Sequence, residues 1–500
     1  MADQSSGKSG TRSREKRWLG VFTRSSQRVA NVLGIIPADE AGKVKKFRKQ
    51  ELETLDQYYE NRQYDKMPEW NASIAADNDY VAVRKRKPLL IYPFPKLLCS
   101  RVASKLVGDD TFPRQVVEED PDTTEFIRLI QKHSKMKARL LEPVRRMLGA
   151  GSCFVRFSIV QGQYKIEHYL SKYCYPIFDA VGELESVRIQ YCYEDEEDRD
   201  SKGDPKKKWY RLDLTKMVDV LYDSPEFNAN ASPTFNPVAE VQHNLGFVQG
   251  EWFRTSIEKH NVDGYSLFGD IMGFCDELSY NLSQSSQSIM YNQDPQMVIN
   301  NMSEDEIDAL IKSSMKAWNL GKEGKAEFLE SDLGAVKVAS EYRKDIRLGI
   351  QDLARVILLD PEKVVSHAQS GKAMEVLHGP MVELIKELRP EVEDRIANLT
   401  LKMMAATLQM SSEGMLLAIQ PPPGYRPKSL LITTNWAPVF PMTVNDLKEK
   451  LSVATSATAA NIASREWATR WLAKDLGVEN VEEELAKIAA QPVLNPFGGF

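Results

Sequence analysis

Apolar residues recur at helical spacing through the first third of the chain. Their positions predict an amphipathic helix over 44–66, which ends before Pro68, and two more helices over 94–107 and 123–148. A pair of glycines closes the last of these, because glycine readily adopts the left-handed conformation that ends a helix. The chain therefore begins with a helical layer.

After residue 151 the hydrophobic period changes from that of a helix to that of a strand. Alternating runs on either side of Gly162 predict a β-hairpin over 153–170. A second pair of strands, over 183–194 and 206–223, flanks a segment in which an acidic arm is followed by a basic arm. The acidic arm lacks the D-x-D-x-D-G order of a calcium loop, so we interpret the segment as a solvated loop.

Two long helices enclose a small unit in the middle of the chain. They are predicted over 266–292 and 341–359. Between them, short strands over 296–300 and 325–330 flank a helix that begins with a capping box at Ser303. The order strand, helix, strand predicts a compact unit at the end of a pair of long helices.

The first of these long helices carries no charge over its second half, from Leu278 to Gln293. Serine, glutamine and asparagine replace the Glu and Lys that a water-facing helix normally has. We therefore expect this face to pack against other polar helices, for example those of identical copies around a ring.

The longest periodic signal lies over 372–410. Nine apolar residues take eight steps that total 29 residues, which is the period of an α-helix. Pro380 and Pro390 are expected to kink this helix. A strand that ends near Trp436 follows, and then three helices over 444–460, 464–475 and 481–490.

These elements predict an α+β fold that is mainly helical. Of the 500 residues, 42% are hydrophobic and 27% are charged, which is typical of a globular chain and excludes a disordered one. No stretch of about 18 apolar residues lacks charge, so we expect no membrane span. The five cysteines are odd in number and never form a CxxC pair, which excludes a disulfide framework and a zinc site of that kind.

Charge is distributed unevenly along the chain. The first 50 residues carry 12 Lys and Arg against 4 Asp and Glu, whereas the other 450 have a formal charge of -14. We interpret this basic tail as a solvated, flexible segment, with a contact to phosphate or to a partner as the alternative. Apolar residues interrupt the basic run at Trp18, Leu19, Val21 and Phe22, which favours docking of part of the tail. The acidic body argues against a protein that holds nucleic acid tightly, although DNA could still slide past it.

The motifs of common enzymes are missing. Gly7-Lys8-Ser9 has only the ending of a phosphate-binding loop, and HExxH is absent. The segment from Gly264 to Gly269 misses the spacing of a nucleophile elbow by one residue. The six histidines are scattered, without metal-ligand spacing. We therefore expect no catalytic residue, no metal and no cofactor.

Four stretches of the sequence, taken in order, form a recognisable set. They are His243 to Gly246, Gly264 to Ile271 with Asp276 to Asn281 after it, Ser370 to Met374, and the strand and helices from Ser429 onward. In this order they resemble the portal proteins of tailed double-stranded-DNA bacteriophages, of the long-tailed-phage type. The similarity runs from about residue 151 to 490, although Asn244 and Gln249 stand where relatives often have proline.

The resemblance implies a portal-type subunit with a wing, a stem, a clip and a crown, and it places the long kinked helix in the wing. The implied parts are a basic tail (1–43), the wing (44–262), a first stem helix (263–294), the clip (295–333), a second stem helix (334–360), a tunnel loop (361–371), the remaining wing with the long helix and strand (372–442), and the crown (443–500).

The resemblance also implies a structural role without enzymatic activity. Such subunits form a ring, usually of twelve copies, at one vertex of the capsid of the virion, assembled in the host cytoplasm. The ring is the channel through which double-stranded DNA is packaged and ejected. The implied partners are other copies of the chain, the DNA, the terminase large subunit, the major capsid and scaffolding proteins, and a head-tail adaptor, with no membrane.

The site residues follow from the same resemblance. The tunnel loop would offer polar and basic side chains to the DNA channel, namely Lys363, His367, Gln369 and Lys372. The clip would dock the motor and then the connector through Glu304, Asp305, Glu306, Lys322 and Lys325. The stem would pack against neighbouring subunits through Leu278, Asn281, Leu282, Gln284, Ile346, Ile350 and Leu353.

Two other classes of protein remain as alternatives. Another virion ring, such as a head-tail adaptor, is disfavoured because 500 residues with two long helices are large for a connector. A packaging nuclease or ATPase is disfavoured because the nucleotide loop is missing. An image of the purified protein as a ring with a central hole would exclude the packaging enzyme.

Overall fold

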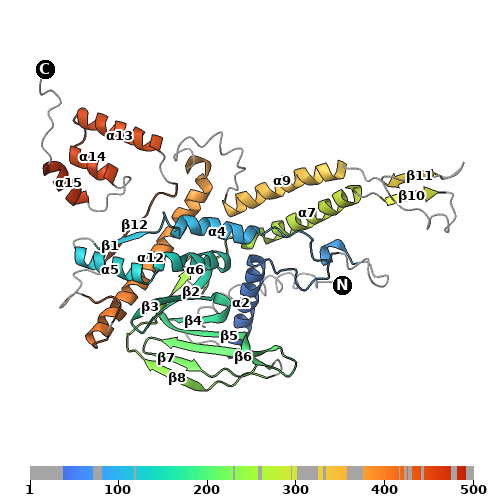
Figure 1. Cartoon of the computed structure of the whole chain (residues 1–500), viewed down its shortest axis with the longest axis horizontal. Helices are drawn as coiled ribbons and strands as arrows, with labels where there is room; N and C mark the ends of the chain where they lie inside the picture. Colours follow the sequence, from blue (N-terminus) through green and yellow to red (C-terminus); the bar gives the residue numbers. More distant parts are fainter. Residues whose placement is uncertain are drawn as a thin grey trace, which may run out of the picture.

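The computed structural model describes most of the chain, with several gaps. In Figure 1, α7 and α9 project together from a mixed helical and sheet body, with β10 and β11 at their far end, and three C-terminal helices lie apart from the body. The described residues are 38–70, 81–117, 120–228, 231–256, 262–293, 296–300, 325–329, 334–356, 375–415, 417–421, 425, 431–440, 444–473 and 481–490.

Four helices build the first layer of the body. They are α2 (Ala38–Tyr59), α4 (Phe94–Val107), α5 (Pro121–His133) and α6 (Met136–Ala150). The bounds of α4 match the prediction, whereas α2 ends earlier than expected. The single helix predicted over 123–148 is wrong, because Lys135 adopts the left-handed conformation (φ 52°) and separates α5 from α6.

A three-stranded antiparallel sheet lies against this layer. Its order is β3 (Gln163–Leu170), β2 (Ser152–Val160), β9 (Gly250–Arg254). The predicted hairpin is confirmed, with a two-residue turn in which both Gln161 and Gly162 have positive φ. Every residue of β9 is buried, so the alternation that marks a half-exposed strand is missing from it.

The second sheet has five antiparallel strands in sequence order. They are β4 (Cys174–Phe178), β5 (Leu184–Arg199), β6 (Pro205–Thr215), β7 (Val218–Tyr222) and β8 (Pro237–Gln242). The sheet lies at the lower side of the body in Figure 1. Its two edge strands, β4 and β8, each have one paired neighbour.

The charged segment is the tip of a hairpin, but its solvated loop is shorter than the sequence indicated, because the two arms continue β5 and β6. Glu194 lies opposite Lys207 in the register, and Asp195 lies opposite Lys206. Lys208 Nζ forms ion pairs with both Asp195 (2.9 Å) and Asp198 (2.8 Å). Opposite charges on facing positions stabilise a two-stranded ribbon, so the two arms neutralise each other instead of binding an ion.

The two-helix hairpin consists of α7 (Met272–Gln293) and α9 (Gly334–Ala354), with β10 (Gln296–Asn300) and β11 (Lys325–Leu329) between them. Both strands were predicted, and the structure shows that they pair antiparallel. A short 3-10 turn, η3 (Gly269–Ile271), precedes α7. The helix predicted at Ser303 lies outside the described residues. The helix expected over 341–359 begins earlier, at Gly334.

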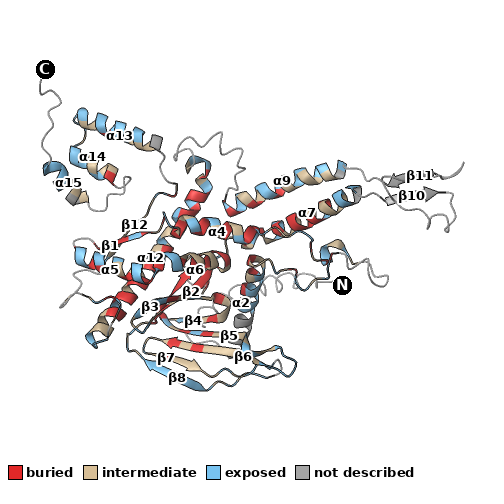
Figure 2. Cartoon of the chain, viewed as in Figure 1, coloured by how far each residue is buried: buried red, intermediate tan, exposed pale blue. Residues whose placement is uncertain are grey.

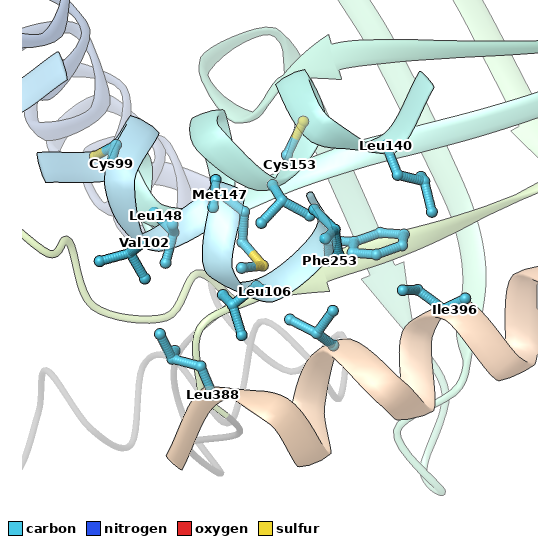
Figure 3. Packing of buried hydrophobic residues seen from close by; sticks show 14 of the residues in the cluster. Cys99, Val102, Leu106, Leu140, Met147, Leu148, Cys153, Phe253, Leu388 and Ile396 are labelled. Carbon is cyan, nitrogen blue, oxygen red and sulfur yellow. The ribbon is translucent and has the colours of Figure 1, made fainter. Parts of the chain in front are cut away.

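The long helix α12 (Gly379–Ser412) crosses the body and fills its core. Its 34 residues span about 51 Å. Pro380 occupies the first turn, where its missing N–H costs nothing, so this proline begins the helix and does not kink it. Pro390 lies inside the helix. In Figure 3, Leu388 and Ile396 of α12 lie close to Leu106 and Phe253.

The last part of the chain contains a strand and three helices. β12 (Ile432–Asn435) pairs with β1 (Arg114–Val117), a strand that the sequence pattern did not reveal. The three predicted helices are confirmed as α13 (Val444–Ala459), α14 (Arg465–Ala473) and α15 (Val481–Ala490). Within the described residues, no helix is both long and apolar enough to cross a bilayer.

Candidate functional site

The two helices of the hairpin are joined along a narrow buried seam. Leu278 of α7 and Ile346 and Ile350 of α9 are buried against each other and against the core of the body. Gly349 gives room for the ring of Phe274, since a Cβ at this position would lie 3.2 Å from its Cε1 atom. The seam holds the hairpin as one unit that projects from the body (Figure 1).

The uncharged face of α7 packs against the chain's own segment 88–92. The hydroxyl oxygen of Ser283 accepts a hydrogen bond from the Leu90 N–H (3.0 Å), and that of Ser279 accepts one from the Tyr92 N–H (3.5 Å). Each serine donates its own proton to the carbonyl four residues earlier in α7. Serine suits these positions because one small hydroxyl satisfies both the helix carbonyl and an extended backbone.

Further polar residues of α7 also find partners inside the chain. The Tyr280 hydroxyl donates to the carbonyls of Arg84 (2.9 Å) and Arg86 (3.1 Å). The Trp70 indole N–H donates to the Gln287 amide oxygen. The charge-free run therefore serves contacts within one subunit at these positions, and a neighbouring copy is not needed to explain it.

A carboxylate holds the root of the hairpin to the first helix layer. Asp276 accepts hydrogen bonds from the hydroxyls of Tyr58 (2.7 Å) and Tyr64 (2.5 Å). Burial, and then the hydrogen bond to this carboxylate, raise the pKa of both tyrosines above the ordinary value. Both tyrosines therefore stay neutral donors at neutral pH.

Arg343 links the two helices of the hairpin. Its Nη1 atom donates to Asn281 Oδ1 (3.0 Å) and to Ser285 Oγ (2.6 Å). The guanidinium of Arg343 in α9 thus lies against the uncharged face of α7, whose side-chain oxygens accept its hydrogen bonds. This contact sets the rotation of one helix relative to the other.

The outer surface of the hairpin is apolar along one line. Val338, Tyr342 and Leu353 of α9 are exposed by 66%, 46% and 53%, and they recur at helical spacing on one side of the helix. Phe274 of α7, which packs over Gly349, continues the line and is 39% exposed. We call these four residues the apolar stripe of the hairpin. Figure 2 shows α9 as largely exposed along its length.

The seven predicted stem residues differ in burial within the single chain. Leu278, Ile346 and Ile350 are buried in the seam, and their contact with a neighbouring subunit stays a prediction. Asn281 binds Arg343, and Leu282 packs partly against the core. The remaining two, Gln284 and Leu353, are exposed.

The predicted channel and docking residues lie almost entirely outside the described residues. This holds for Lys363, His367, Gln369 and Lys372 of the expected tunnel loop, and for Glu304, Asp305, Glu306 and Lys322 of the expected clip. Lys325 begins β11 and faces Asn300 across the strand pair. The roles of these residues stay predictions.

A buried ionic cluster, which the sequence did not suggest, fastens α12 to the small sheet. Glu251 of β9 accepts from Arg395 Nη1 (2.8 Å) and from Lys402 Nζ (2.6 Å), and all three side chains are 4 to 13% exposed. Burial opposes the charge of Arg395, but the field and hydrogen bond of Glu251 outweigh it and raise the pKa of the guanidinium. The signal in the sequence was an acidic residue directly before the apolar pair Trp252 and Phe253 of β9.

The sequence His243 to Gly246 forms a turn that joins three elements. His243 Nδ1 accepts from the Leu245 N–H (3.3 Å), and its carbonyl accepts from the Gln409 side chain of α12 (3.1 Å). His243 Nε2 lies 3.4 Å from Asp219 of β7, whose pKa is raised by burial. Asn244 and Gly246 take positive φ, so proline at 244 would not fit this turn.

No metal site emerges from the described part of the chain, where no group of three or more His, Cys, Asp or Glu side chains is arranged to hold an ion. The four cysteines in the core, which are Cys99, Cys153, Cys174 and Cys275, are free thiols, and burial raises the pKa of each. Thiols that are protonated and buried are poor nucleophiles and poor metal ligands.

Ser283→Ala is expected to lower the free energy of unfolding by about 1 to 3 kcal/mol, because it leaves the Leu90 N–H without its acceptor in a part-buried site. Urea unfolding followed by tryptophan fluorescence measures the change. Gln284→Ala, at the exposed neighbouring position, is the matched control and should change stability by less than about 0.5 kcal/mol. Equal losses in the two variants would contradict the role given to Ser283.

Comparison with known proteins places the chain in a family. The family model described as "Phage portal protein, SPP1 Gp6-like" matches residues 43–492. Comparison with curated proteins finds no match. The match to the family model therefore carries the assignment.

Solved structures with a similar course of the chain come from gene transfer agent particles. One is described as the virion of the native gene transfer agent particle (10% identity, 75% of this chain, 87% of that chain, TM-score 0.39). A second is the neck of the empty particle computed with C6 symmetry (11% identity, 75% of this chain, 88% of that chain, TM-score 0.40). A third is the neck of the native particle computed with C12 symmetry (11% identity, 77% of this chain, 95% of that chain, TM-score 0.34). Since the family model spans most of the 500 residues, the chain belongs to the SPP1 Gp6-like family of phage portal proteins.

Proposed function

We propose that the ring which a phage portal protein forms at one capsid vertex is closed, in this protein, by head-to-tail contacts between neighbouring two-helix hairpins. The observation that carries the function is the family match over residues 43–492. The proposal about the contact is supported by the apolar stripe, since four large side chains in one line would otherwise remain in water. A head-to-tail contact repeated around an axis closes a ring.

The number of subunits is proposed to be twelve, and the hole of the ring is proposed to be the channel for packaging and ejecting double-stranded DNA. The charge of -14 outside the first 50 residues supports a channel that does not hold DNA, because a ring of acidic bodies repels phosphates. Portal proteins of this family are structural components of the virion, so the energy for packaging would come from a separate ATPase.

The strand pair β10–β11 and the residues between its strands are proposed as the clip, at the far end of the hairpin (Figure 1). The clip would dock the terminase large subunit during packaging and a head-tail adaptor afterwards. Its charged residues support this role, because rim charges select partners and speed their association. The proposed contacts are Glu304, Asp305, Glu306, Lys322 and Lys325.

The remaining parts are assigned by their place in the chain. Residues 361–371 lie between α9 and α12 in the sequence and are proposed as the tunnel loop. Its Lys363, His367 and Gln369, with Lys372 directly after it, would meet phosphates as DNA passes. The body, with residues 44–262 and 372–442, is proposed as the wing that contacts major capsid and scaffolding proteins. Helices α13 to α15 are proposed as the crown. Assembly is proposed to occur in the host cytoplasm.

Reversing Glu304, Asp305 and Glu306 to lysine is expected to leave ring formation intact and to block DNA packaging, because the clip would repel the motor. Electron microscopy of the purified protein measures ring formation, and nuclease-protected DNA in assembled particles measures packaging. Glu196→Lys with Glu197→Lys, at the far end of β5, is the matched control. The proposed clip would be wrong if the triple variant packaged DNA normally, and the proposed ring would be wrong if the parent protein formed none.

A further inference from the structure

An open groove of about 1370 Å³ lies beside the root of the hairpin. Its walls are α2, the strands β4 to β6, and the turn that leads into α7. Three large apolar side chains line it and are exposed: Phe47 by 70%, Ile177 by 52% and Tyr265 by 41%. Apolar side chains that gather in a groove, and not singly on a surface, mark a place where another segment binds.

The charges of this groove are mainly negative. Of the charged residues that line it, four are acidic and two are basic. Both arginines are already paired: Arg48 binds Asp263 (2.6 Å) and Arg188 binds Asp213 (2.9 Å). The remaining two acidic residues are Glu51 and Asp270, and both are exposed at the rim. An occupant that is apolar at its centre and basic at its ends would match this groove.

We propose that the groove is occupied by the segment Trp18–Phe22 of the same chain. This segment, WLGVF, is the apolar interruption of the basic tail, with Arg17 before it and Arg24 after it. Residues 1–37 carry seven Lys and Arg against two Asp and Glu, so their charge is opposite to that of the rim. The aromatic ends of the segment cover Phe47 and Ile177, while the flanking arginines face Glu51 and Asp270.

The reach of the chain agrees with this placement. The tail joins the body at Ala38, the first residue of α2, and Phe47 lies nine residues further along that helix, or about 14 Å. Fifteen residues separate Phe22 from Ala38, which span up to about 50 Å when extended. The tail can therefore fold back along α2 into the groove that α2 itself lines, without help from a second copy.

Trypsin digestion of the full-length protein tests the proposal. Cleavage after Arg17 and Arg24 is expected to be slower than cleavage after Lys8, and Ile177→Asp should accelerate it about fivefold, since digestion follows the fraction of undocked tail. Val181→Asp is the matched control, because Val181 is 89% exposed and does not line the groove. Equal rates at all tail sites in the parent protein, or equal acceleration by both variants, would overturn the proposal.

Cross-linking identifies the occupant independently of the digestion rates. In a Cys192→Ser background, Val21→Cys and Ile177→Cys are introduced together and treated with a short bismaleimide. A cross-link within one chain is expected, seen by mass spectrometry of the monomer band. A cross-link between chains would show that a second copy fills the groove, and no cross-link would show that the tail stays outside; either result would overturn the proposal. Neither the digestion nor the cross-linking experiment requires that the protein forms a ring.

Discussion

Replacing Tyr342 and Leu353 together with aspartate is expected to abolish ring assembly while each subunit stays folded. Both side chains belong to the apolar stripe and are about half exposed in the single chain, so the subunit loses little when they change. In the ring, each contact would instead bury two unpaired carboxylates, at a cost of several kcal/mol per contact. Light scattering and electron microscopy should show monomers where the parent protein shows rings.

The control for this variant carries the same added charge elsewhere. Val160→Asp with Val181→Asp places two aspartates on exposed apolar positions of the body, away from the hairpin. This control should assemble as the parent does, and both variants should retain the thermal transition of the parent subunit. If the stripe variant forms rings as readily as the control, the hairpins do not make the contact that closes the ring.

Glu251→Ala is expected to destabilise the body by about 3 to 5 kcal/mol, because it removes the counter-charge of Lys402 and the shortest ion pair of Arg395, which keeps only the longer contacts to Asp394 (3.5 Å) and Glu391 (3.9 Å). Arg254, whose pKa is lowered by burial and then by Arg395, adds a further cation nearby. The free energy of unfolding, measured by urea in the ring-deficient background, gives the size of the loss. Packing between α12 and β9 should be the first contact to weaken.

Two further variants test whether the loss of stability comes from unpaired buried charges. Glu125→Ala removes the same side chain from the exposed pair with Arg128 and should cost much less stability, because water screens this pair. Glu251→Leu with Arg395→Met and Lys402→Met removes all three charges and should recover most of the lost stability, since apolar side chains replace a buried ionic cluster well. A loss from Glu251→Ala no larger than that from Glu125→Ala would show that water reaches the cluster.

The sequence alone predicted the elements that depend on local patterns. The hairpin around Gly162, helix α4 and the three C-terminal helices all followed from period and turn residues, which act between neighbours in the chain. The order of two long helices around a strand pair was also predicted, and together with four ordered stretches it indicated the portal family. Strands β1 and β9 were missed for different reasons: every residue of β9 is buried, so it has no alternation, whereas β1 has only four residues, too few for its alternation to be recognised.

The charged arms of β5 and β6 and the uncharged face of α7 show where local patterns mislead. The composition of the arms is that of a loop, but Glu194 and Asp195 lie opposite Lys207 and Lys206 across the ribbon, and only the register reveals this. The face of α7 indicated contacts between copies, whereas its serines bind the backbone at Leu90 and Tyr92, nearly 190 residues earlier. The composition of a helix face shows whether the face is polar, but it does not show which segment packs against that face.

What the sequence determined was the set of elements, their order, and the family to which the chain belongs. The tertiary structure decided which polar side chains are buried and what each one meets. Glu251 and Arg395 are 144 residues apart, and they meet only because α12 packs across β9. The apolar stripe likewise could be identified only from the tertiary structure, which shows Phe274 packed against Gly349 and both Ile346 and Ile350 buried in the seam. Such pairings depend on packing between distant segments, which neither period nor composition encodes.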